Sequence, residues 1–251
     1  MKTVITFEAD SSVYTNSNLL TFSAPFRWLK KGWRDFRRAT FHSLSYGTFF
    51  VAIGWLLVYV AQTNGGYFLP TLFMVMLLVG PALAFGLYDV SRELEHKHRP
   101  SFSHERKKVF SEMGHELMLS LMMTVIFMFI IILASLVTNI LAMPWQAGVT
   151  AALPMSDTTF LVVAVVFAGL LFSVNSFALP MILDKDATAG TATTTSLNAV
   201  WKNKSVMALW ALLVVALMAV GFATYLLAFF IIIPVLGYAS WHAYRETIVI
   251  E

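Results

Sequence analysis

Residues 205–244 read SVMALWALLVVALMAVGFATYLLAFFIIIPVLGYASWHAY, and this stretch contains no Asp, Glu, Lys or Arg. A helix rises about 1.5 Å per residue, and about 20 apolar residues cross the hydrocarbon core of a bilayer. The run is therefore too long for one tilted helix and fits two, at 205–221 and 223–244, with a tight turn near Gly221. One span fewer at this end, five in all, remains the alternative count.

The rest of the chain has the same character. Of 251 residues, 58% are hydrophobic and only 12% are charged, and the mean hydropathy is +0.73. These values exclude an ordinary soluble domain or a disordered chain, and four further apolar runs are long enough to span, at 43–62, 67–88, 117–141 and 159–183. The sequence predicts an all-α, polytopic membrane protein with six transmembrane helices, arranged as three helical hairpins with preceding cytoplasmic amphipathic helices. Residues 1–25 form a polar cytoplasmic N-terminal segment, and 26–246 form the six-span membrane domain.

The basic residues test this arrangement. All 17 Lys and Arg fall before the first span, in the connections after the second and fourth spans, or in the tail. Cytoplasmic loops retain Lys and Arg, whereas short translocated loops avoid them. We therefore expect a multi-pass protein with both termini in the cytoplasm and only short loops on the far side.

The stretch before the first span is the clearest amphipathic segment. Phe26, Leu29, Trp33 and Phe36 share one helical stripe, and basic side chains line another. We expect this helix in the headgroup plane, where it either docks on the membrane surface or binds a cytoplasmic partner. The residues predicted to do so are Trp28, Arg27, Lys31, Trp33, Arg34 and Arg38. Each even-numbered span also holds a proline near its cytoplasmic end, which is either a tolerated kink or part of a transport cavity.

Residues that could carry chemistry are few. No ionisable residue falls at the middle of a span, where a charge would point to a pathway or proton relay. Asp89, His115, Asp184 and His242 lie near predicted cytoplasmic ends and form a candidate polar cluster. We predict no catalytic residue, cofactor or metal, and the chain has no Cys. A haem- or metal-binding subunit using His42, His115 and His242 is a further hypothesis.

Five motifs carry a resemblance to a known family. They are RWLKKGWRDF at 27–36, SLSYG at 43–47, GPALAFGLYDVSRELE at 80–95, FALPMILDKDA at 177–187 and PVLGYASWHAYRE at 234–246. In this order the chain resembles, over about residues 26–246, the bacterial integral membrane family of domain of unknown function 2189.

Some members of this family are described as cytochrome c oxidase subunits. The resemblance implies a non-catalytic accessory subunit of a respiratory complex such as a haem-copper (cytochrome c) oxidase, in the bacterial inner membrane. The expected partners are the lipid bilayer and other membrane subunits of that complex, and not nucleic acid. The alternative is a small inner-membrane transporter or lipid-handling protein.

Overall fold

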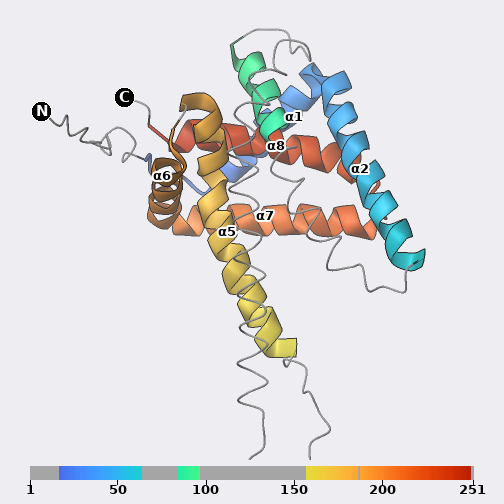
Figure 1. The fold of residues 1–251 in the computed structure, drawn as a ribbon. Helices are drawn as coiled ribbons and strands as arrows, with labels where there is room; N and C mark the ends of the chain where they lie inside the picture. The colour runs from blue at the N-terminus through green and yellow to red at the C-terminus, as the bar shows by residue number, and fades with distance from the viewer. Residues whose placement is uncertain (1–16, 64–83, 97–156, 186, 250–251) are drawn as a thin grey trace, which may run out of the picture. The chain divides into compact units, whose positions relative to one another are not determined.

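The computed structural model describes residues 17–63, 84–96, 157–185 and 187–249, and their secondary structure is helical apart from one antiparallel bridge between Ser17 and Ile248. The helices are α1 (Ala24–Arg38), α2 (Thr40–Thr63), a helical segment at 84–95, α5 (Asp157–Lys185), α6 (Ala189–Lys202), α7 (Lys204–Ala223) and α8 (Phe229–Thr247), as Figure 1 shows. The all-α prediction is confirmed for these residues.

Two of the described helices are long and apolar enough to cross a membrane. They are Thr40–Val60 in α2 and Lys204–Ala223 in α7, and they correspond to the predicted spans 43–62 and 205–221. The helix predicted at 159–183 is α5. The six-span count and the hairpin arrangement stay predictions, because the span 117–141, most of the span 67–88, residues 1–16 and His115 lie outside the described residues.

The chain forms two compact units, one made of residues 1–54, 87–100 and 174–251 and the other of residues 55–86 and 101–173. In the second unit, apolar side chains of the two described helical stretches are exposed, among them Trp55, Tyr59 and Leu170. Exposed apolar side chains along a helix are expected where lipid or another membrane helix covers them. The site described below lies entirely in the first unit.

The long apolar run forms two helices, α7 and α8, which are joined by a tight turn. The turn occupies residues 224–228, slightly later than expected, and its central residues Tyr225 and Leu226 have positive φ angles of 51° and 71°. The Leu226 amide donates to the Gly221 carbonyl at 2.9 Å. A Cβ atom on Gly221 would overlap the ring of Phe229, so a glycine at this position allows the two helices to approach each other closely.

Helix α8 is the centre of the first unit, and glycines bring its neighbours close to it. A Cβ atom on Gly32 of α1 would lie 2.6 Å from the Val235 carbonyl oxygen and 2.9 Å from the Ala239 amide nitrogen. A Cβ atom on Gly237 of α8 would lie 2.6 Å from a side-chain carbon of Leu87. Small residues permit this close backbone approach between membrane helices. Glycine contacts thus fix both α1 and the segment 84–95 against α8.

The end of the predicted N-terminal segment is attached to this unit. The Asn18 amide donates to the Thr247 carbonyl at 2.8 Å, beside the bridge at Ser17. The Asn203 side chain accepts from the Leu20 amide at 2.8 Å and donates to the Asn18 carbonyl at 2.9 Å. Residues 17–20 therefore connect the end of α8 with the junction between α6 and α7.

Candidate functional site

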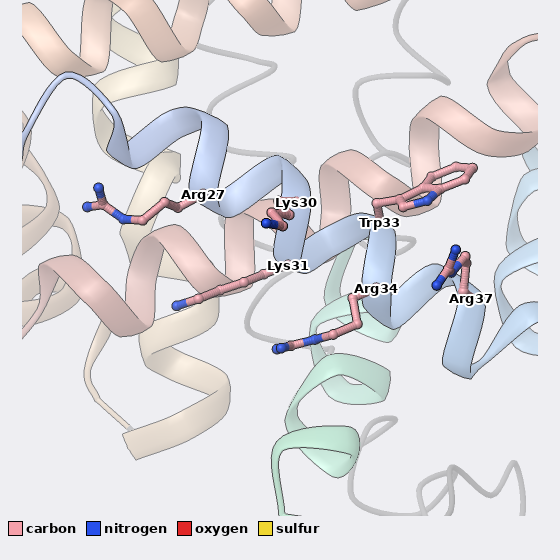
Figure 2. A pocket seen from close by; sticks show the side chains of 6 residues that line it. All are labelled: Arg27, Lys30, Lys31, Trp33, Arg34 and Arg37. Carbon is pink, nitrogen blue, oxygen red and sulfur yellow. The ribbon is translucent and has the colours of Figure 1, made fainter.

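The outward side of α1 carries a concentrated positive charge. Its side chains line an open concavity of about 470 Å³, and the lining residues are Arg27, Lys30, Lys31, Trp33, Arg34 and Arg37. We call these six residues the basic face. Figure 2 shows Arg27, Lys31 and Arg34 extending in one direction from the helix, with Trp33 and Arg37 beside each other farther along it. Their spacing of three and four residues places them on one side of a helix.

The opposite side of α1 is buried, and this corrects the predicted position of Trp28. Trp28 is fully buried; its ring packs edge-on against Trp210 at 5.6 Å, and its indole Nε1 donates to Glu246 at 3.2 Å. Phe36 is also buried, whereas Trp33, predicted on the same stripe, is 44% exposed. The reason is that α8 covers the line through Trp28, Gly32 and Phe36, which are four residues apart. Trp28 is therefore a packing residue, not a surface residue.

The charges of the basic face are only partly compensated. Arg27 lies 2.5 Å and Lys31 4.0 Å from the carboxylate of Glu246 on α8. Arg34 lies 4.0 Å from Asp35. Within the described part of the chain, no carboxylate lies within ion-pair distance of Lys30 or Arg37. The face therefore keeps a net positive charge that is open to solvent or to an anionic surface.

Asp35 is the one acidic residue in 26–38, and it points into the protein. Its Oδ2 atom lies 2.6 Å from Nε2 of His242 and accepts a 2.8 Å hydrogen bond from the Ser91 hydroxyl. All three residues are buried. Nearby, the hydroxyls of Ser43 and Tyr238 share a 2.8 Å hydrogen bond. Asp35 thus connects α1 both to α8 and to the segment 84–95.

The Ser91, Asp35 and His242 group does not have the geometry of a nucleophilic triad. In such a triad the imidazole accepts the serine proton, and the carboxylate orients the imidazole from its other nitrogen. Here the serine hydroxyl and the imidazole both bind the same carboxylate oxygen. The imidazole therefore does not accept the serine proton, and the geometry is that of a buried cross-link between three helices.

The residues of the predicted polar cluster have separate partners. His242 pairs with Asp35, which sequence reasoning missed. Asp89 pairs with Arg92, and its second oxygen, Oδ2, is buried without a hydrogen-bond partner among the described residues. Asp184 accepts from the Tyr244 hydroxyl at 2.9 Å. His115 lies outside the described residues. In the described residues no three His, Asp or Glu side chains are grouped for a metal ion, and the predicted absence of a metal stays a prediction.

The ends of three helices are instead joined by a chain of polar contacts. Nη1 of Arg92 donates to the Leu183 carbonyl at 2.9 Å, at the end of α5, where a cation interacts favourably with the helix dipole. Arg245 lies between Glu95 at 3.3 Å and Asp184 at 3.4 Å. The Trp241 indole also donates to Glu95, at 3.0 Å. We call this set the polar clasp; its members are Arg92, Glu95, Asp184, Trp241, Tyr244 and Arg245.

The polar clasp connects all three helix ends to one another. It connects the segment 84–95 to α5, α5 to α8, and α8 back to the segment 84–95. Its side chains are bound to one another or to a helix-end carbonyl, so their contacts serve to hold the three helix ends together. Asp35 and Glu246 add α1 to the same assembly. The basic face is therefore presented by a helix that is fixed on its buried side.

One comparison with known proteins gave a match to part of this chain. Neither the comparison with curated proteins nor that with solved structures gave a match. The family described as predicted integral membrane protein, domain of unknown function 2189, matches residues 68–184. This region includes Asp89, Arg92, Glu95 and Asp184, while α1 and α8 lie outside it. Residues 68–184 of the chain are thus similar to this family of predicted integral membrane proteins.

Proposed function

We propose that the protein is a non-catalytic accessory subunit of a bacterial respiratory complex, such as a haem-copper oxidase, in the inner membrane. The proposal is carried by the apolar faces that α2 and α7 leave open. In the two candidate spans, only 17% and 22% of the residues are buried inside the chain. Leu212 and Val215 of α7 are among the exposed ones. Such faces can pack against lipid or against the helices of a larger membrane complex.

Two further features support a structural role. The polar side chains of the Asp35 group and of the polar clasp hold helices together, as a scaffold requires. The resemblance to family members described as oxidase subunits supplies the class of partner. The alternative, a small transporter or lipid-handling protein with a cavity near Asn175 and Pro180, stays a prediction.

Copurification tests the proposal. The protein is extracted in a gentle detergent at native expression level, and its companions are identified by mass spectrometry and by haem absorption. We expect stoichiometric subunits of one respiratory complex. Recovery of the chain alone, or with respiratory subunits only in trace amounts, would refute the proposal.

Variants then locate the contact. Leu212→Trp on α7 and Leu56→Trp on α2 enlarge exposed positions on the two candidate spans, and Leu19→Trp is the matched control outside the helices. If one of these faces carries the contact, its variant loses the partner while the control keeps it. Equal retention by all three variants would exclude both tested faces as the site of contact.

Cysteine labelling tests the proposed orientation, with both termini in the cytoplasm. The chain has no Cys, so a single introduced thiol reports its own side of the membrane. We expect Thr63→Cys, at the end of α2, to react with an impermeant reagent in intact spheroplasts. We expect Arg38→Cys, before α2, to react only after permeabilisation. The reverse pattern would contradict this orientation.

A further inference from the structure

We propose that the basic face of α1 binds the phosphate headgroup of an anionic phospholipid of the phosphatidylglycerol type. Five cationic side chains and one indole line a single concavity on this helix (Figure 2). Its volume of about 470 Å³ is in the range of small-ligand sites. The ligand chemistry follows from the lining, because guanidinium and ammonium groups together with an indole suit a phosphate that borders on apolar surface.

The charge balance favours an anion. Of the five cations, Arg27 and Lys31 share the carboxylate of Glu246, while Lys30 and Arg37 have no carboxylate within 4.0 Å in the described part of the chain. These two residues are exposed, so an incoming phosphate would not need to displace an existing ion pair. The planar guanidinium of Arg37 can donate two parallel hydrogen bonds to phosphate oxygens. Lys30 supplies a compact charge on the same side of α1, about two turns earlier.

The location favours a lipid over a free phosphate. Thr40, the first residue of the candidate span in α2, follows the last residue of α1, Arg38, after a single residue. The basic face therefore lies within a few turns of the place where the chain meets the membrane. Apolar side chains flank it, since Phe26 is 55% exposed and Phe41 is 74% exposed. A soluble oxyanion has no apolar part to contact these rings, whereas the interfacial part of a lipid would contact them.

The face is also held in place before a ligand arrives. Trp33 is stacked on Phe36, with ring centroids 5.3 Å apart and planes 9° apart. The backbone of α1 is fixed by the contact of Gly32 with α8 and by the hydrogen bonds of Asp35. A preorganised site loses less conformational entropy on binding. This rigidity distinguishes a headgroup site from a helix that rests loosely on a charged surface.

A lipid titration of the full-length protein tests the proposal. The protein is purified in a neutral detergent, and binding of phosphatidylglycerol and phosphatidylcholine with identical acyl chains is measured by native mass spectrometry. The test variant is Lys30→Gln/Arg37→Gln. The matched control is Arg38→Gln/Lys204→Gln, which removes the same charge from exposed positions that do not line the concavity. Circular dichroism establishes that both variants keep their helices.

We expect wild type to prefer phosphatidylglycerol, and the test variant to bind it about 30-fold more weakly, because each basic residue near an anionic surface contributes about fivefold. The control should lose clearly less, and phosphatidylcholine binding should not change. Equal loss in the two variants would overturn the proposal, since it would reduce the effect to overall charge. Displacement of the lipid by inorganic phosphate would overturn it in favour of a free oxyanion. If wild type showed no preference for phosphatidylglycerol, the proposal would be overturned. Capture of an acidic protein through the same residues would then favour a protein partner.

Discussion

Replacing Asp35 by Ala tests whether the buried contacts of α1 hold this helix on α8. The Asp35 side chain is 4% exposed and that of His242 is 10% exposed, so their 2.6 Å contact is shielded from water. The substitution removes the carboxylate that binds both His242 and Ser91. It leaves the imidazole and the hydroxyl buried without this partner.

The expected cost follows from these two groups. A buried polar group that loses its hydrogen-bond partner costs about 1–3 kcal/mol. Hydrogen bonds between membrane helices are weaker on average, about 0.6 kcal/mol each. Because Asp35 accepts two contacts on one atom at almost complete burial, we expect a loss of about 3 kcal/mol. Asp35→Asn keeps the size of the side chain and should lose less.

A second contact between α1 and α8 supplies the control. Arg27 binds Glu246 at 2.5 Å, but the two side chains are 45% and 24% exposed. Exposed ion pairs contribute about 0–1 kcal/mol, so Arg27→Ala should cost no more than that. Unfolding of the purified protein by dodecyl sulfate in mixed micelles, followed by tryptophan fluorescence, measures both variants. If Asp35→Ala costs less than about 0.5 kcal/mol, or no more than Arg27→Ala, the attribution of stability to burial is wrong.

Three further substitutions examine other contacts. Gly32→Ala places a methyl group against the backbone of α8 and should cost about 1–3 kcal/mol, whereas Gly190→Ala on α6 meets open space and should be neutral or stabilising by up to about 1 kcal/mol; thermal melts compare the two. Tyr238→Phe and Ser43→Ala should show a coupling of about 1 kcal/mol in a double-mutant cycle, and additive effects would contradict their shared hydrogen bond. Arg92→Met leaves a buried carboxylate without its cation and frees the end of α5, so limited proteolysis should cut the variant faster than wild type after α5.

In the described part of the chain, the lengths and positions of the apolar runs predicted the helices. The run 205–244 forms α7 and α8, and the basic stretch before the first span forms α1 with its cations outward. These features follow from local sequence, because helix length and charge exposure depend on the segment itself. The turn after Ala223 came slightly later than predicted, since both of its residues with positive φ are non-glycine and carry no turn signal.

The buried face of α1 could not be predicted in the same way. A helix with apolar residues at 26, 28, 29, 33 and 36 offers several apolar directions, and the sequence does not say which one meets α8. The small residue Gly32 between Trp28 and Phe36 was the available signal, since it allows the closest backbone approach. Asp35 lies on that same side, three residues after Gly32. It was missed because its partner His242 is 207 residues away in the sequence.

The positions of the polar contacts give a physical meaning to the family motifs. The segments at 80–95, 177–187 and 234–246 contribute every member of the polar clasp, and the segment at 27–36 contributes Trp28 and Asp35. The residues named here all belong to the first unit. The contacts between these motifs hold the helices of the first unit together. The outward residues of α1 have no such explanation within the described chain, and for this reason we assign binding to the basic face and assembly to the polar clasp.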